Sequence, residues 1–250
     1  TCYLVFFQYV GTALKAAERL RFAMPVKSSP TDTGVHALGN STHPDIQRLA
    51  IRPPFSPDIL TLAFNRHLEH PDIRVIRAFC VPDDFYAQFE DTSRTYLYQV
   101  ATSCSLDKLS VFDWNPCWDL KADHLDVVAI QEVSQHLQGT NNFQAFRSTS
   151  DNNWQSPVKT LLWVSVVPAP VSPSLILEKR KVQFWDTEFE SKSFLYKQVC
   201  RMTACLVAVG LGTTPQVKET LESQDPGSGP GLLGAPAQGL FLKSVHYDGL

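Results

Sequence analysis

Strand-like and helix-like segments follow one another irregularly along this chain of 250 residues, and their order is what most restricts its fold. Short stretches rich in aromatic and β-branched residues predict strands, and longer stretches with apolar residues at helical spacing predict helices. Strands are expected at residues 3–9, 73–81, 92–101, 158–167 and 181–189, and helices at residues 13–22, 57–70, 123–138, 193–211 and 214–223. Because no regular β-α-β repeat is present, a parallel doubly wound sheet is not expected. The order favours a mixed α+β fold.

Two of the predicted helices begin at recognisable capping residues. Ser56 precedes a proline at the first helical position, and Asp58 places a negative charge in the first turn. Asp123 can cap the helix predicted at residues 123–138, and Gly139 can end it. The apolar residues expected on the inward face of that helix are Leu125, Val128, Ala129 and Leu137.

The chain is long enough for two lobes. It is 44% hydrophobic, so it can bury a sizeable core. From about residue 103 the pattern becomes irregular for some fifteen residues, roughly the length of a long connection. We interpret this stretch as the passage from an N-terminal lobe, residues 1–102, into a C-terminal lobe, residues 103–250.

The charge of the chain excludes a strongly basic nucleic-acid binder. Its formal net charge is −3, so no global positive field attracts RNA or DNA. Any contact with nucleic acid must use a local patch. One stretch of the first half is locally basic and is either such a patch or simply a solvated face; it contains Arg66, His67, Arg74, Arg77 and Arg94.

Neither a metal site nor a membrane segment is expected. The six cysteines are scattered without Cys-x-x-Cys spacing and read as reduced interior thiols. His36 and His43, near Asp32 and Asp45, do not match a metal-binding signature. No apolar run approaches the ~20 residues that a membrane span needs. We therefore expect a soluble intracellular protein without a metal.

The run Thr31-Asp32-Thr33-Gly34 places one acidic residue in a tight turn between two apolar segments. An ordinary Asx-turn has the same appearance, with Gly34 supplying a positive φ. The alternative is a carboxylate that backbone donors hold in place and Val35 shields, which could act as a nucleophile. The turn alone does not decide between the two.

Further motifs follow in a fixed order: Phe-Tyr-Ala-Gln-Phe at residues 85–89, Arg-Thr-Tyr-Leu-Tyr at 94–98, and apolar closing stretches at 236–242 and 245–247. With the run from Thr31 to Ala37, they resemble the motifs of the TruA family of tRNA pseudouridine synthases. The signature of that family reads Gly-Arg-Thr-Asp-x-Gly-Val-His-Ala. The resemblance covers nearly the whole chain and is nearest to the animal members placed in mitochondria.

The resemblance implies the pseudouridine synthase fold: two ferredoxin-like lobes whose antiparallel sheets join around a central RNA-binding cleft. It implies Asp32 as the catalytic residue, without metal or cofactor, and Tyr96 as the side chain that stacks on a flipped uridine. Without the resemblance, Tyr96 would read as a core tyrosine beside Tyr98. The other residues that the resemblance places against the substrate are Thr31, Gly34, Val35, His36, Arg94 and Lys159.

Four positions depart from the family pattern, in which each carries arginine: Pro30, Gln88, Lys159 and Cys200. Proline supplies neither charge nor a donor, and lysine keeps the charge but loses the bidentate fork. Cys200 stands where an arginine would pair with the catalytic carboxylate. Arg201 is adjacent, but one helical step rotates a side chain by about 100°. The chain also lacks a loop and helix start that the family carries after Thr12.

The resemblance implies tRNA as the partner, allows a homodimer, and places the protein in mitochondria, or otherwise in the cytoplasm. Because of the four replaced arginines, two further interpretations stay open. One is a catalytically weakened or inactive RNA-binding paralogue of the same fold, and the other is a module that contacts proteins.

Overall fold

The computed structural model describes residues 1–11, 34–48, 52–102, 116–148, 155–170, 182–213, 217–225 and 234–249. The chain divides into two compact units, Thr1–Arg94 with Phe241–Leu250, and Thr95–Leu240. The lobe boundary predicted near residue 102 stays a prediction. The helix expected at residues 13–22 lies outside the described residues.

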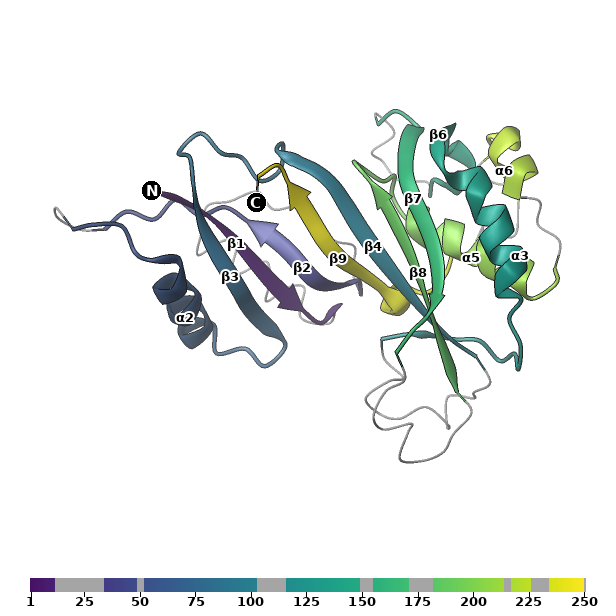
Figure 1. Ribbon diagram of the computed structural model, residues 1–250, viewed down its shortest axis with the longest axis horizontal. Helices are drawn as coiled ribbons and strands as arrows, with labels where there is room; N and C mark the ends of the chain where they lie inside the picture. Colours follow the sequence, from purple (N-terminus) through teal and green to yellow (C-terminus); the bar gives the residue numbers. More distant parts are fainter. Residues whose placement is uncertain are drawn as a thin grey trace. The chain divides into compact units, whose positions relative to one another are not determined.

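The first unit contains four strands in the order β3-β1-β2-β9 (Figure 1). Their bounds are β1 (Cys2–Tyr9), β2 (His36–Thr42), β3 (Ile73–Val81) and β9 (Leu240–Tyr247). Strand β1 runs antiparallel to both β2 and β3, whereas β2 runs parallel to β9. Every residue of β1 except Gln8 is buried, which explains why its sequence is an almost continuous apolar run. The strands expected at residues 3–9 and 73–81 are confirmed.

Helix α2 (Pro57–Leu68) packs against β3 and begins where the sequence predicts. The side chain of Ser56 accepts a hydrogen bond from the backbone N–H of Ile59, as an N-cap does. Asn65 attaches the helix to the sheet, since its amide nitrogen donates to the carbonyl of Val75 and its amide oxygen accepts from the N–H of Val75, both at 2.8 Å. A polar side chain thus substitutes for a neighbouring strand at this edge.

The second unit carries strands in the order β4-β8-β7-β6, with β5 beside β4. Their bounds are β4 (Asp91–Thr102), whose first residues up to Arg94 belong to the first unit, β5 (Trp118–Asp119), β6 (Gly139–Asn142), β7 (Val158–Pro168) and β8 (Gln183–Ser191). The pairs β6–β7 and β7–β8 are antiparallel, and β4–β5 is parallel. The pairings whose directions are given are therefore mostly antiparallel, and the α+β class predicted from the sequence is confirmed.

Helices α3 (Val127–Ser134), α5 (Gln198–Gly210) and α6 (Val217–Ser223) lie beside strands β6 to β8 of this unit (Figure 1). Gly210 permits the contact between α5 and α3, because a Cβ there would lie 2.5 Å from the Cδ1 atom of Ile130. Its carbonyl also accepts the N–H of Asp126 at 2.9 Å. The largest fully buried side chains of this unit are Tyr98, Phe143, Phe146, Phe189, Leu137, Leu161, Met202 and Leu206.

Two helix predictions are corrected at their N-terminal ends. The cap of α3 is Asp126, whose side chain accepts the N–H of Ala129, so the helix begins later than the expected cap Asp123. In this register the buried face carries Ile130 and Ser134, and Val128, expected inward, is 65% exposed. Helix α5 starts at Gln198 instead of residue 193, directly after Lys197 in a left-handed conformation.

Of the five cysteines in the described part of the chain, four are buried and Cys80 is exposed. The expectation of interior thiols is therefore wrong for Cys80, which is exposed on strand β3. No helix in the described part of the chain is long and apolar enough to cross a membrane.

Candidate functional site

The predicted catalytic turn is described only at its C-terminal side. Thr31, Asp32 and Pro30 lie outside the described residues. Gly34 has a φ of 89°, the conformation that the turn requires and that glycine adopts readily. Val35 and His36, the next two residues, are buried and lead into β2. The positive φ at Gly34 agrees with the turn predicted from the sequence.

The two described ends of the segment that carries Asp32 are fastened to each other. The N–H of Gly11, just beyond β1, donates to Nδ1 of His36 at 3.1 Å. A Cβ at Gly11 would clash with the backbone of Gly34, so the two glycines make a close backbone approach. The His36 ring in turn stacks on Phe241 of β9, with centroids 4.8 Å apart. Contacts that involve β1, β2 and β9 therefore hold Gly11 and Gly34, the described residues on either side of this segment, close together.

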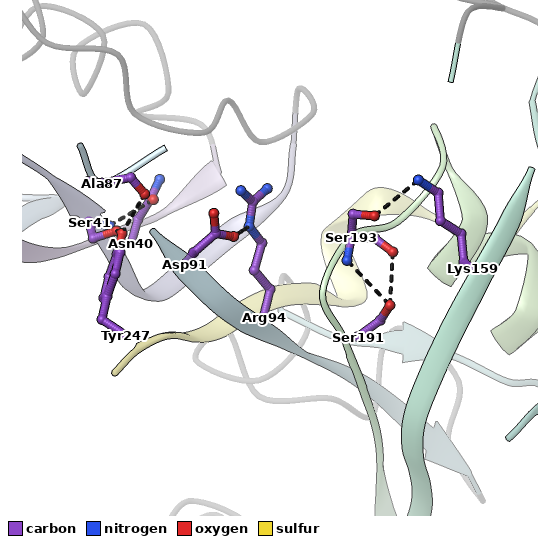
Figure 2. A network of polar contacts seen from close by, with 9 residues as sticks. All are labelled: Asn40, Ser41, Ala87, Asp91, Arg94, Lys159, Ser191, Ser193 and Tyr247. Atoms are coloured by element: carbon purple, nitrogen blue, oxygen red, sulfur yellow. Dashed lines mark hydrogen bonds and ion pairs between the residues drawn. The ribbon is translucent and has the colours of Figure 1, made fainter. Parts of the chain in front are cut away.

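Arg94 is held by an acidic partner three residues earlier on β4. Its Nε lies 2.7 Å from Oδ2 of Asp91, and the Asp91 side chain is 7% exposed (Figure 2). Because burial strengthens a charge pair of good geometry and makes an unpaired carboxylate costly, this contact orients the guanidinium. The sequence marked Arg94 but not Asp91, although their i,i+3 spacing was visible.

Tyr247 connects the last strand to the start of this region. Its phenol donates to the carbonyl of Ala87 at 2.9 Å and lies 2.6 Å from Oγ of Ser41 (Figure 2). Burial raises the pKa of Tyr247 to about 12. The hydroxyl therefore stays neutral and serves as a connector between β2, β9 and the loop before β4. Tyr247 belongs to the closing sequence motif at residues 245–247, but that motif does not indicate a role for its hydroxyl.

Tyr96 and Tyr98 both lie on β4 but differ in environment. Tyr98 is fully buried, its hydroxyl donates to the carbonyl of Pro236 at 2.6 Å, and burial raises its pKa far above the usual value. Tyr96 is only half-buried and meets Phe194 edge-on, with centroids 5.1 Å apart and planes at 87°. Tyr98 is thus a core residue, whereas part of Tyr96 is open to solvent.

Lys159 occupies β7 opposite Asn141. Its Nζ donates to Oγ of Ser193 at 3.0 Å, and Ser193 is tied to Ser191 through both its N–H and its carbonyl (Figure 2). Partial burial, and secondarily the positive charge of Arg147, lower the pKa of Lys159. The ammonium is therefore a positioned cation in the second unit, at a position where the family pattern carries arginine.

Besides Lys159, two more of the replaced arginine positions can be described. Cys200 is buried in α5, and its neighbour Arg201 is also buried and donates from Nη1 to the carbonyl of Arg147. Burial lowers the pKa of Arg201. At the other position, Oε1 of Gln88 is buried and accepts no hydrogen bond from the described residues. Arg201 thus has a structural contact of its own, with the backbone of Arg147.

The described part of the chain brings together no three His, Cys, Asp or Glu residues that could hold a metal ion. What it does contain is a set of cations, hydroxyls and half-buried aromatic side chains. Such groups bind phosphates by charge and bases by stacking.

A family model described as tRNA pseudouridine synthase matches residues 133–248. A Homo sapiens protein named tRNA pseudouridine synthase-like 1 is 53% identical over 275 residues, covering 99% of this chain and 90% of that protein. Its Xenopus laevis counterpart is 46% identical, covering 99% of this chain and 91% of that protein. A tRNA pseudouridine synthase A of Caulobacter vibrioides is 34% identical, covering 87% and 79%.

The aligned length of 275 residues with the human protein exceeds the 250 residues of the chain. The human relative therefore has residues between the aligned segments that this chain lacks. The location of a missing segment after Thr12 stays a prediction.

Proposed function

Because this chain belongs to the tRNA pseudouridine synthase family, we propose that it isomerises uridine in tRNA with Asp32 as the catalytic side chain. In this reaction the bond from C1′ to N1 breaks, the uracil turns, and a bond from C1′ to C5 forms. The proton that leaves C5 is balanced by one gained at N1, so no redox partner is required. The Asp32 carboxylate either attacks the nucleotide or assists the cleavage of the glycosidic bond.

The observation that carries this proposal is the fastening of the segment 12–33 at both ends. The bond from Gly11 to His36 and the close approach of Gly11 to Gly34 hold Gly34, two residues after Asp32 in the sequence, against the end of β1. A carboxylate that attacks a sugar carbon must be positioned closely, since a misplacement of about 1 Å can cost a hundredfold in rate. A firmly held backbone just before β2, next to the catalytic carboxylate in the sequence, is the local structure that such positioning needs.

The other candidate residues suit binding of the flipped nucleotide. Tyr96 is half-buried, with its edge against Phe194, and would stack on the uracil. Arg94 and Lys159 are each oriented by a neighbour, Asp91 and Ser193, and would contact phosphates. Thr31, Gly34, Val35 and His36 would shape the turn around the base.

We further propose mitochondrial tRNA as the substrate, because the resemblance is nearest to animal members placed in mitochondria. We also propose a homodimer, because the resemblance to the family allows one.

A second candidate function is a weakened or inactive paralogue that still binds tRNA. It is favoured by Cys200, a neutral buried residue where an arginine would pair with the carboxylate, and by the binding of Arg201 to the Arg147 carbonyl. Without that pairing the pKa of Asp32 would be higher than in a paired arrangement. Loss of one positioned donor can lower a rate by about a hundredfold or more.

The experiment that separates the two uses the full chain with tRNA that contains 5-fluorouridine, which traps this chemistry as an adduct. We expect a stable adduct with the wild type, none with Asp32→Asn, and an undiminished adduct with the matched control Asp45→Asn. The second candidate instead requires that unmodified tRNA keep every uridine while binding is unaffected by Asp32→Ala.

A further inference from the structure

A loop connects β3 to β4 (Figure 1). It carries two large aromatic side chains that are exposed. Tyr86 is 56% exposed and Phe89 is 73% exposed. Their ring centroids are 6.5 Å apart and their planes are inclined at 54°. Two adjacent exposed rings of this size form an apolar patch of the kind that marks a binding surface.

The backbone of this loop is held firmly, so the exposure of the two rings is built into the fold. The carbonyl of Tyr86 accepts the N–H groups of Phe89 and Glu90 at 2.9 and 3.1 Å. The N–H of Ala87 donates to Nδ1 of His43 at 3.2 Å, and its carbonyl accepts from Tyr247 (Figure 2). The side chain of Phe85, between the exposed residues and β3, is buried. The rings are therefore pre-positioned, which lowers the entropic cost of binding.

Three side chains with carboxylate groups lie in the same loop as the two exposed rings. Asp83, Asp84 and Glu90 are all exposed, and none of them forms an ion pair with a described residue. Asp83 accepts the N–H of Cys2 at 3.3 Å and is also attracted electrostatically to the N-terminal ammonium of Thr1, whereas Glu90 accepts the N–H of Tyr86 at 3.4 Å. The cation nearest along the chain, Arg94, is already paired with Asp91. We call these five residues, Asp83, Asp84, Tyr86, Phe89 and Glu90, the acidic–aromatic loop.

We propose that the acidic–aromatic loop docks a basic segment of a partner protein, a function separate from tRNA modification. An arginine or lysine of the partner would lie over the ring of Phe89 or Tyr86 while a carboxylate compensates its charge. Guanidinium suits this surface better than ammonium, because it is planar and more weakly hydrated. RNA would also stack on the rings, but the negative charges of Asp84 and Glu90 would repel its phosphates.

The test uses the full chain and a capped peptide of alternating Arg and Gly as the probe, followed by NMR of the aromatic resonances. We expect the probe to shift the resonances of Tyr86 and Phe89. The same peptide with citrulline in place of arginine keeps the shape but lacks the charge, and should bind about fivefold more weakly or not at all.

Two double variants test the contributions of the rings and of the carboxylates separately. Tyr86→Ala with Phe89→Ala removes the rings, and Asp84→Asn with Glu90→Gln removes charge while keeping hydrogen-bond acceptors. Each should weaken binding of the arginine peptide by about fivefold or more, measured by titration calorimetry because one variant lacks both reporter rings.

The matched controls lie on α2 of the same unit. Ile59→Ala with Leu62→Ala removes side chains that are 53% and 71% exposed, and Asp58→Asn with Glu69→Gln removes equal charge. These variants should leave binding unchanged. Equal weakening by the controls, equal binding of the citrulline peptide, or a single-stranded oligouridylate that shifts the loop resonances in place of the peptide would each overturn the proposal.

Discussion

The phenol of Tyr247 donates a hydrogen bond of 2.9 Å to the backbone carbonyl of Ala87, a residue 160 positions earlier in the chain. The same oxygen lies 2.6 Å from Oγ of Ser41 on β2. One buried hydroxyl thus joins β9, β2 and the acidic–aromatic loop. Because Tyr247 has one hydroxyl proton and gives it to Ala87, Ser41 is the donor in the second bond.

Tyr247→Phe should lower the free energy of unfolding by about 1–2 kcal/mol, because the Ala87 carbonyl and the Ser41 hydroxyl would remain buried without their partner. Urea denaturation followed by circular dichroism measures this difference. The matched control is Tyr86→Phe, which removes a hydroxyl from a ring that is 56% exposed and should change stability little. Similar losses in the two variants would show that the buried connection does not stabilise the unit.

The same residue predicts a dependence on alkaline pH. Burial raises the pKa of Tyr247 from 10.0 to about 12 in the folded protein. The neutral phenol therefore stabilises the fold fully below pH 10.0, and this contribution is lost as the pH rises toward about 12. The stability advantage of the wild type over Tyr247→Phe should be constant near neutral pH and shrink across this window. An advantage that grows with pH would contradict the assignment.

Gly11→Ala should impair the segment 12–33 more than the fold. Its new Cβ would clash with the Gly34 carbonyl, at a cost of about 1–3 kcal/mol, and would displace the turn that carries Asp32. We expect pseudouridine formation in tRNA to fall by about tenfold or more. In the control Gly139→Ala, the new Cβ meets nothing within 4 Å and only the backbone with φ of 86° is strained. That variant should lose about 1 kcal/mol and keep its activity.

Cys200→Arg restores the arginine of the family pattern on α5. If Asp32 lacks its partner in this chain, the variant should raise kcat/KM for pseudouridine formation by about tenfold or more. Cys200→Met is the matched control, because it lengthens the side chain without adding charge. An unchanged rate in both variants would mean that position 200 does not act on the carboxylate.

Local patterns were sufficient to predict most elements of the fold. Strand β1 is an apolar run, and α2 carries its cap and proline at the expected positions, so both could be predicted from neighbouring residues alone. The start of α3 was missed because Asp123 and Asp126 are equally good caps in sequence. Only packing against Gly210 of α5 selects the register in which Val128 faces solvent.

The candidate site was less accessible to sequence reasoning. The resemblance marked His36, Arg94 and Lys159, but it did not indicate which groups hold them. The contacts of His36 with Gly11 and Phe241 join residues from three strands, and Lys159 meets Ser193 from across the β7–β8 hairpin. Such pairs depend on strand order and register, which no local pattern encodes. The roles of Asp32 and Thr31 stay predictions.

The parallel pairing of β2 with β9 has a consequence for biosynthesis. The first unit uses residues 241–250 as well as its N-terminal residues, so its sheet is still missing a strand when most of the chain has left the ribosome. Residues 95–240 are translated before that strand, so the second unit has the opportunity to mature first. Until translation reaches Tyr247, the nascent first unit exposes one edge of β2 and needs protection from aggregation.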